Sequence, residues 1–193
     1  MDIQKLIDMG CPVRKYPKDA IVYEPGMQPR NVFFVKVGEV RMVTVNHDGK
    51  EFIQGIFQSG QYFGEPALLV DKPYLAYTIV SKPSEIITVS KQNFINLIKT
   101  DADYSMSLIK VLSNRLFYKS MMLEELANEK AEHRLLTIIN YLFSDYAKGE
   151  SLNVTRQDLA DLTGLRVETV IREVKNLADK NLILLKRGKI FKV

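Results

Sequence analysis

Residues 154–183 read VTRQDLADLTGLRVETVIREVKNLADKNLI. Thr155 followed by Asp158 is typical of a helix N-terminus, because the Thr hydroxyl can accept a hydrogen bond from a backbone N–H one turn into the helix. We expect a short helix from there to about Leu162, followed by a turn at Thr163-Gly164-Leu165. Two short helices joined by a glycine-containing turn describe a helix-turn-helix.

The second helix of this pair is expected to begin at Arg166. Its apolar residues Val167, Val170, Val174 and Leu177 are spaced three, four and three residues apart, which predicts one buried face. In a recognition helix the N-terminal outward residues reach base edges, where Arg can donate twice to guanine and Glu can accept from cytosine. The candidates for base reading are Arg166, Glu168, Thr169 and Arg172.

Two of these candidates have a second possible role. Glu168 and Arg172 lie four residues apart, so they can also form an exposed ion pair on the helix surface. The two roles are compatible, since a Glu that holds an Arg in its reading geometry also contributes to recognition.

A short basic hairpin is predicted after this helix. Asn181 is a plausible left-handed helix stop, and the runs Leu182–Lys186 and Lys189–Val193 flank the turn pair Arg187-Gly188. A helix-turn-helix followed by such a hairpin is a winged arrangement. Its cations would lie near phosphates and add affinity that depends on salt but not on sequence. They are Lys186, Arg187 and Lys189.

The charge of the chain is concentrated at this end. Between Arg166 and Lys192 there are eight Lys or Arg and three Asp or Glu residues, a local charge of +5 in a chain of net charge +4. The remaining residues therefore sum to −1. Such a distribution favours a surface that faces a polyanion, although a solvated basic tail would have the same composition.

The N-terminal part of the sequence predicts an antiparallel sandwich or barrel. Short runs rich in Val, Ile, Phe and Tyr alternate with turn residues, and Gly38, Gly49 and Gly60 follow one another at intervals of eleven. The Asp48-Gly49 pair suits a tight hairpin, which makes His47 a loop-tip residue. The expected strands are Ala20–Glu24, Val32–Val37, Glu39–Val45, Glu51–Phe57 and Glu85–Val89.

A long helix is expected between the two parts, over about Ala102–Asn128, where no Gly or Pro occurs. At about 1.5 Å per residue this helix would overhang a small sandwich, so a second copy of the chain is expected to cover its apolar stripe. The alternative is a helix that packs only on its own domain. The stripe consists of Ile109, Leu112, Leu116, Leu123 and Leu126. A further helix is expected over Arg134–Tyr146.

Cysteine and histidine are too few for most metal chemistry. Cys11 is the single cysteine, so no internal disulfide or thiolate cluster can form within one chain, and a structural thiol is the expected role. His47 and His133 are far apart in sequence. We therefore expect no metal site, no cofactor and no enzymatic activity.

Membrane and secretion signals are also not apparent. The longest uncharged apolar runs are far shorter than the roughly 18 residues of a membrane span, and the first residues lack the apolar core of a signal peptide. A soluble, cytoplasmic protein is expected.

Two stretches together resemble one known family. Residues 154–183 are similar to the DNA-binding segment of the Crp/Fnr (catabolite activator / fumarate-nitrate regulator) transcription factors, and VNHDGKEFIQGIFQSGQYFGEPALL, residues 45–69, resembles their cyclic-nucleotide-binding domain. The resemblance implies an α+β fold with an antiparallel jelly roll, a dimerisation helix and a winged helix-turn-helix. The implied domains are residues 1–100, 101–129 and 130–193, with a hinge near Asn128–Lys130.

The resemblance also implies roles for individual residues and partners. Glu168 and Arg172 occupy base-reading positions of the family, whereas Val167 stands where the catabolite activators have a further Arg. Double-stranded DNA, a second copy of the chain and RNA polymerase are the implied macromolecular partners. The positions that contact phosphate in the family are Thr155, Arg156 and Gln157 here.

The expected effector pocket departs from the family pattern. Gly64 and Glu65 match the Gly-Glu pair that holds the ribose of a cyclic nucleotide, but Leu75 and Ala76 occupy the places of the Arg-Ser pair that holds the cyclic phosphate. Without the bidentate Arg, a buried phosphate loses its strongest hydrogen bonds. We therefore expect no usual binding of cyclic AMP, and a small effector other than a cyclic nucleotide.

The leading hypothesis is thus a homodimeric transcription regulator that reads a near-palindromic DNA site. A ligand-binding regulatory protein that acts through a protein partner is the alternative, and a neutral or acidic outward face on the second helix would favour it. An enzyme on a jelly-roll scaffold would need a metal triad or an acid–base pair, and the sequence offers neither.

Overall fold

The computed structural model describes residues 3–47, 49–127, 130–144 and 146–193, except for the side chain of Leu126. The chain divides into two compact units, Met1–Val111 and Leu112–Val193. Helix α4, Ala102–Ala127, begins in the first unit and continues into the second. No helix of the described residues is long and apolar enough to cross a membrane.

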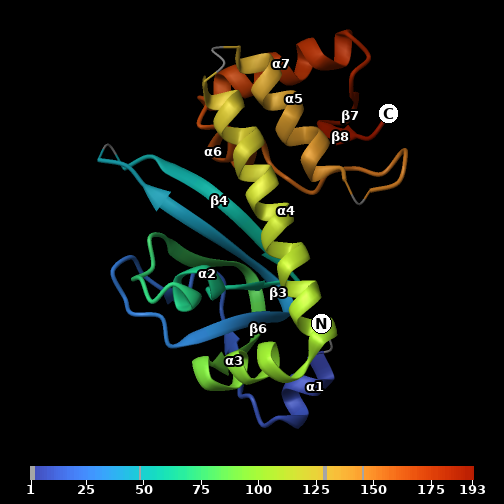
Figure 1. The fold of residues 1–193 in the computed structure, drawn as a ribbon. Helices are drawn as coiled ribbons and strands as arrows, with labels where there is room; N and C mark the ends of the chain where they lie inside the picture. Colours follow the sequence, from blue (N-terminus) through green and yellow to red (C-terminus); the bar gives the residue numbers. More distant parts are fainter. Residues whose placement is uncertain (1–2, 48, 128–129, 145) are drawn as a thin grey trace. The chain divides into compact units, whose positions relative to one another are not determined.

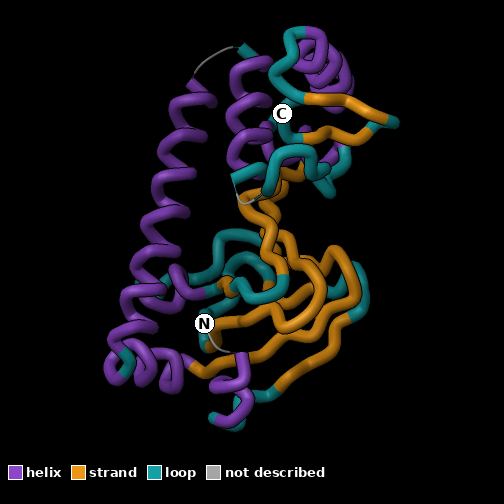
Figure 2. The backbone as a smooth tube through the Cα atoms, turned by 90° about the vertical axis from the view of Figure 1, so that its right-hand side faces the viewer, coloured by secondary structure: helices purple, strands orange, loops and turns teal. Residues whose placement is uncertain are grey.

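The first unit is built around a six-stranded antiparallel sheet (Figures 1 and 2). Strands β1, β6, β3 and β4 form the main path, β2 pairs with β6, and β5 pairs with β3. The strands are β1 Val13–Tyr16, β2 Ile21–Tyr23, β3 Asn31–Val45, β4 Glu51–Gln58, β5 Tyr62–Phe63 and β6 Tyr77–Ser90.

The sheet rolls around a core rich in aromatic rings. Strand β3 is buried at four consecutive residues, Val32–Val35, so both of its faces are covered there. Tyr23 stacks on Tyr74 with ring centroids 3.7 Å apart, and Phe33 stacks on Phe63 at 5.4 Å. These contacts close the jelly roll that the sequence predicts.

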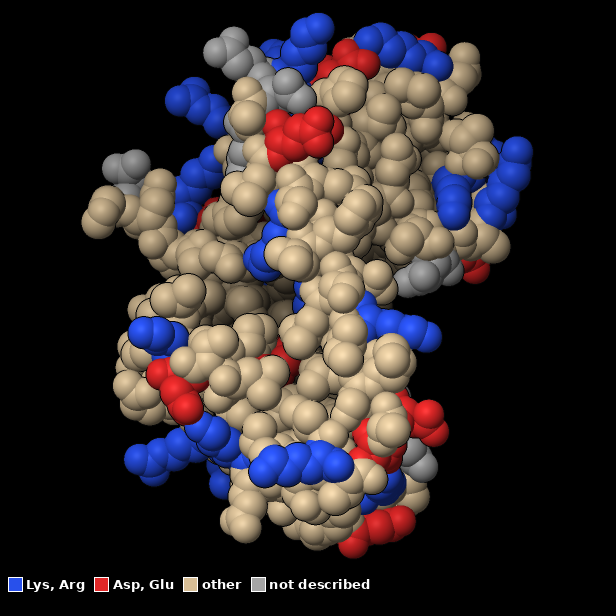
Figure 3. Space-filling view, in the orientation of Figure 1, with Lys and Arg blue, Asp and Glu red and all other residues tan. Residues whose placement is uncertain are grey.

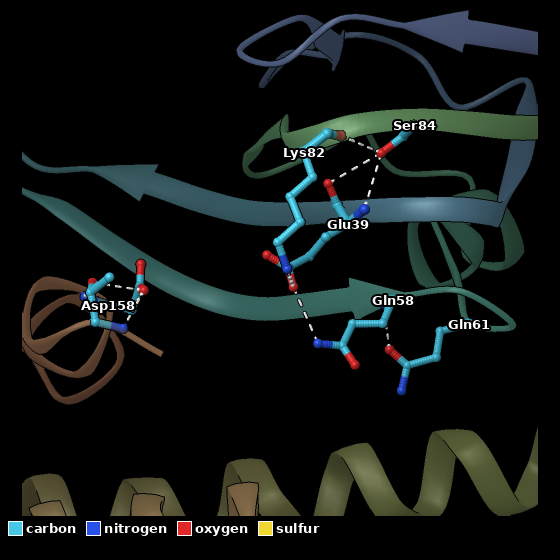
Figure 4. Close-up of polar contacts among 7 residues, drawn as sticks. Glu39, Gln58, Gln61, Lys82, Ser84 and Asp158 are labelled. Carbon is cyan, nitrogen blue, oxygen red and sulfur yellow. Dashed lines mark hydrogen bonds and ion pairs between the residues drawn. The ribbon is translucent and has the colours of Figure 1, made fainter. Parts of the chain in front are cut away.

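Gly38 corrects one predicted feature of this sheet. It does not separate two strands but lies inside the single strand β3, at a bulge opposite Pro83 and Ser84 of β6. Its φ is +99°, and a Cβ there would lie 2.1 Å from Ser84 Oγ. Figure 4 shows Ser84 Oγ between the two strands, where it accepts from the Glu39 N–H and donates to the Lys82 carbonyl.

Other strand predictions were incomplete. Strand β1 was missed because its side chains are exposed or half-buried and show no apolar pattern. Strand β5 has only two residues. The predicted strand Glu85–Val89 is the second half of the longer β6. His47 is exposed in the loop between β3 and β4 as expected, whereas Asp48 lies outside the described residues.

Helices cover the sheet of the first unit. They are α1 Ile3–Asp8, α2 Glu65–Leu69, α3 Lys91–Thr100 and the first part of α4. The hydroxyl of Ser90 caps α3 by accepting from the Asn93 N–H at 3.2 Å. Cys11 is buried, and burial raises the pKa of its thiol, which agrees with a structural role.

The second unit contains three further helices and a small hairpin. Helix α5 is Ala131–Leu142, α6 is Arg156–Thr163 and α7 is Val167–Asp179. Strands β7 Leu184–Lys186 and β8 Lys189–Phe191 pair in antiparallel orientation. Helix α5 begins three residues before and ends four residues before the predicted bounds of Arg134–Tyr146.

Candidate DNA-binding surface and effector site

A complete capping box starts α6. Thr155 Oγ1 accepts from the Asp158 N–H at 3.0 Å, and Asp158 Oδ2 accepts from the Thr155 N–H at 2.8 Å; Asp158 is labelled in Figure 4. Both contacts satisfy N–H groups that have no partner within a helix. At the other end Gly164 has φ +70°, so α6 ends in the left-handed conformation that glycine favours.

The apolar faces of the three helices form the core of the second unit. Val170, Val174 and Leu177 of α7 are at most 1% exposed, as the three- and four-residue spacing predicts, whereas Val167, the first residue of the predicted face, is half-buried. Ala160 of α6 is also buried, and its small side chain permits a close helix approach. Leu135, Ile138 and Ile139 complete this core from α5. The buried face fixes which side of α7 remains outward.

The outward face of α7 carries the predicted base-reading residues. Arg166, Glu168 and Arg172 are exposed, and Thr169 is half-buried. Arg172 Nε donates to Glu173 Oε1 at 3.0 Å, so its ion pair is with its neighbour and not with Glu168 as the sequence suggested. Hydrogen bonds, first from Asn176 and then from Arg172, lower the pKa of the Glu173 carboxyl.

The basic hairpin lies beside the start of α6. Its turn residues Arg187 and Gly188 both have positive φ, +47° and +77°, and Lys186 pairs with Lys189 across the strands. Lys186, Arg187 and Lys189 are exposed. Arg156 Nη2 donates to the Gly188 carbonyl at 2.9 Å, which ties the tip of the hairpin to the first turn of α6.

Thr155, Arg156 and Gln157 therefore lie close to the hairpin cations. Thr155 and Gln157 are exposed, and Arg156 is half-buried because of its contact with Gly188. The structure thus brings the predicted phosphate-contacting residues to one end of the helix-turn-helix. Figure 3 shows Lys and Arg side chains at the margins of the second unit on the face that it displays.

Two lysines of the basic C-terminal stretch make internal contacts. Lys192 Nζ donates to the carbonyls of Phe143 and Tyr146, at 2.9 and 2.7 Å, and so stabilises the end of α5. Lys180 Nζ forms an ion pair with Glu132 at 2.6 Å. These two side chains stabilise the fold of the second unit. The other cations of the stretch therefore supply its exposed positive charge.

The predicted effector residues lie at and after α2. Gly64, with φ +92°, precedes α2, and Glu65 in its first turn is fully buried. Pro66 occupies the helix start, as expected. Leu75 is 84% exposed, whereas the adjacent Ala76 is 3% exposed. The two residues that replace the Arg-Ser pair therefore have very different environments.

Tyrosines surround the buried carboxyl of Glu65. Burial, and then the charge of Glu65, raise the pKa of Tyr74 to about 12. Burial, followed by Tyr62 and Glu65, also raises the pKa of the Tyr104 hydroxyl at the start of α4. The Tyr74 hydroxyl donates to the Asn31 carbonyl at 3.1 Å. The environment of Glu65 is thus tyrosine-rich and closed in this conformation.

Helix α4 exposes much of its predicted apolar stripe. Ile109 is 56% exposed, and Leu116 and Leu123 are each 68% exposed. Leu112 is half-buried, and the side chain of Leu126 lies outside the described residues. In Figure 3 the surface along α4 is largely uncharged. Met106 and Phe117, which the sequence reading did not include, are also exposed on α4.

Sequence reasoning also missed a polar cluster between the end of α4 and α5. Glu125, at 9% exposure, accepts from Thr137 Oγ1 at 2.9 Å, and His133 Nδ1 lies 3.4 Å from the same carboxylate oxygen. Arg134 donates to the backbone carbonyls of Glu125 and Thr163, both at 3.2 Å. The only sequence signal for this cluster is that its charged residues lie within amphipathic helical stretches. Of the expected hinge Asn128–Lys130, only Lys130 is described.

Metal ligands do not gather anywhere in the described part of the chain. No group of three or more His, Cys, Asp or Glu side chains there has the arrangement that could hold a metal ion.

Family models match both parts of the chain. Residues 13–101 match the cyclic nucleotide-binding domain, and residues 133–192 match the Crp-like helix-turn-helix domain. Solved structures share the fold over nearly the full length. The global regulator CLP of Xanthomonas campestris has a TM-score of 0.75 at 24% identity, covering 98% of this chain and 97% of that one. A CooA mutant from Carboxydothermus hydrogenoformans has a TM-score of 0.79 at 21% identity, covering 96% and 85%.

Curated relatives are transcription regulators and not enzymes. The chain is 30% identical over 179 residues to the cAMP-activated global transcriptional regulator CRP of Pasteurella multocida, covering 90% of this chain and 86% of the relative. It is 25% identical over 188 residues to the global nitrogen regulator of Nostoc sp., covering 92% and 83%. With an effector-binding type of domain followed by a DNA-binding helix-turn-helix, the chain belongs to the Crp/Fnr family of transcription regulators.

Proposed function

We propose that this regulator reads a near-palindromic DNA site as a homodimer, with α7 as its recognition helix. The observation that carries the proposal is the outward face of α7, where Glu168, Arg172 and the preceding N-cap residue Arg166 are exposed while the opposite face is buried. Arg and Glu side chains at the start of such a helix match the donors and acceptors of base edges in the major groove. Thr169, on the same part of α7, completes the base-reading set.

A second group of residues contacts phosphates in this proposal. Lys186, Arg187 and Lys189 of the hairpin, together with Thr155, Arg156 and Gln157 at the start of α6, hold the winged unit on the duplex. Their contribution is independent of sequence and falls steeply with salt, because each neutralised phosphate releases counterions. The bond from Arg156 to the Gly188 carbonyl supports this grouping, since it joins the two elements.

Dimerisation through α4 brings two recognition helices to one site. The exposed residues Ile109, Leu116 and Leu123 support a two-fold contact along the helix. Leu112 and Leu126 extend the same stripe in the sequence. Two-fold symmetry places the half-sites about 34 Å, or about 10 base pairs, apart. The proposed division of labour is effector sensing by residues 1–100, dimerisation by 101–129 and DNA binding by 130–193.

The effector is proposed to be a small molecule other than cyclic AMP. Leu75 and Ala76 supply no cation for a cyclic phosphate, and the Leu75 side chain is 84% exposed. The similar proteins differ in the effector that their names give, because one is named as cAMP-activated and another as c-di-GMP responsive. Isothermal titration with cyclic AMP is expected to give no binding at low micromolar concentration. Low-micromolar binding would refute this part of the proposal.

The proposed site of action is the cytoplasm, where a bacterial regulator meets DNA and RNA polymerase. RNA polymerase is the expected protein partner, because a transcription regulator bound at a promoter lies next to the enzyme that it controls.

A gel shift with salt titration tests the DNA-binding proposal. The probes are the DNA upstream of the protein's own gene and a random duplex of equal length. We expect tighter binding to the upstream DNA, with affinity for both probes falling as salt rises. Equal affinity for both probes at every salt concentration would contradict the assignment of α7 as a sequence-reading helix.

A further inference from the structure

Arg134 lies where two helices of the second unit end. Its Nε donates to the backbone carbonyl of Glu125, in the last turn of α4, at 3.2 Å. Its Nη1 donates to the backbone carbonyl of Thr163, the last residue of α6, also at 3.2 Å. One guanidinium on α5 therefore contacts the C-terminal ends of both the long helix and the first helix of the helix-turn-helix.

The chemistry of these contacts favours a guanidinium in particular. The last carbonyls of a helix have no partner within the helix, and the negative end of the helix dipole attracts a cation. The planar fork of Arg can donate to two acceptors in fixed directions, whereas the ammonium of Lys is a compact point charge. Replacement of Arg134 by Lys therefore keeps the charge but loses the geometry that joins the two carbonyls.

The surrounding contacts hold both acceptors in place. Glu125 is largely buried, and its side chain accepts from Thr137 Oγ1 at 2.9 Å, one turn beyond Arg134 on α5. Thr163 is fully buried, and its hydroxyl donates to the Leu159 carbonyl at 2.6 Å. Gly164 follows directly, so the Thr163 carbonyl lies at the turn that leads into α7.

We propose that Arg134 is a positioning residue that fixes the orientation of the helix-turn-helix relative to the end of α4. This inference rests on the proposed function, in which α4 joins two copies and α7 reads each half-site. If α4 sets the two-fold axis, the link through Arg134 sets the distance and rotation between the two recognition helices. Residues that read bases determine the half-site sequence, and Arg134 determines the spacing.

The test is selection from a library of random DNA duplexes by the full-length protein, followed by sequencing. Wild type is expected to enrich paired half-sites with one dominant centre-to-centre spacing of about 10 base pairs. Arg134→Met is expected to enrich the same half-site with several spacings. Arg30→Met is the matched control, because Arg30 is exposed in the first unit and its loss changes the net charge equally. The control should retain the wild-type spacing.

Binding measurements on the selected duplex give the loss of affinity that a change in half-site spacing causes. One inserted base pair moves the half-sites by about 3.4 Å and about 35°, which should weaken wild-type binding about tenfold or more. For Arg134→Met the same insertion should change affinity less than about threefold. For Arg134→Lys the insertion should lower affinity by a factor between those of wild type and Arg134→Met. Thr137→Val, which releases the Glu125 side chain, should change the spacing preference in the same direction and serves if Arg134→Met does not fold.

The outcomes separate this inference from the proposed function. A folded Arg134→Met or Thr137→Val protein that selects the single wild-type spacing would overturn the positioning role, because a purely structural contact alters stability without altering spacing. If wild type itself enriches no paired half-sites, the proposed function fails, and the positioning role fails with it.

Discussion

The proposed base-reading role of α7 depends on two exposed side chains, Glu168 and Arg172. Arg172 is 72% exposed, and its only described ion pair is with the adjacent Glu173. Glu168 is exposed one turn earlier. Glu173 is only 12% exposed, but it also accepts from Asn176 Nδ2 at 3.1 Å, so its carboxylate keeps a hydrogen-bond donor when Arg172 turns to a base edge. The sequence predicted the outward position of Arg172 but not this partner, because side-chain pairing depends on rotamers.

Arg172→Ala should weaken binding to the specific site by about 1–3 kcal/mol and relax the preference at one base pair. The reason is the loss of two donors to one base, which leaves its acceptors without partners. Fluorescence anisotropy with single-base variants of the site measures the effect. Lys189→Ala is the comparison, since it should weaken binding to all duplexes alike and reduce the salt slope by about 1. Equal losses on specific and random DNA for both substitutions would contradict the assignment.

Gly38→Ala should destabilise the first unit by roughly 2 kcal/mol or more, because a left-handed φ and a backbone clash act together. The added Cβ would lie 2.1 Å from Ser84 Oγ and 2.6 Å from the Pro83 carbonyl. Gly26→Ala is the matched control, because Gly26 has φ +85° but nothing within 4 Å of a Cβ. Urea unfolding should show the larger loss for Gly38→Ala. Equal losses would show that the close contact at the bulge costs nothing.

At the scale of elements, the helices of the second unit were predictable because each carries local signals. The Thr155–Asp158 capping box, the left-handed Gly164 and the apolar spacing of α7 all act within a few residues. The strands were less predictable. Gly38 looked like a turn because a positive φ serves a bulge inside a strand as well as a turn between strands.

Thr155→Ala should destabilise the second unit by about 1 kcal/mol, because the Asp158 N–H and carboxylate each lose a partner at the start of α6. Thr155→Ser keeps the hydroxyl and should remain near wild type. Urea unfolding in the absence of DNA, followed by far-UV circular dichroism, separates this effect from any phosphate contact. If Ala and Ser variants have the same stability, the capping box does not contribute.

At the scale of the whole molecule, the order of the domains could be predicted from the two sequence stretches that resemble the family. The contacts of Arg134 with the ends of α4 and α6 could not be predicted. Its two acceptors are backbone carbonyls at residues 125 and 163, and no pattern in the sequence indicates which distant carbonyls a half-buried Arg will reach. The closed environment of Glu65 was equally inaccessible, because it depends on how Tyr74 and Tyr104 pack.

Leu116→Glu should raise the dimer dissociation constant at least about tenfold, or about 1.4 kcal/mol, because it places a charge on the exposed apolar stripe of α4. Analytical ultracentrifugation measures the change. Asn114→Glu is the matched control, since Asn114 is also exposed but lies about 200° around the helix from Leu116. An unchanged dimer with Leu116→Glu would mean that α4 is not the interface.

The most direct test is the competition of a selected paired site against random duplex for the full-length protein at physiological salt. We expect one dimer per site and an affinity at least about a thousandfold higher than for random DNA. A single monomer per site, or the same affinity for both duplexes, would contradict this expectation.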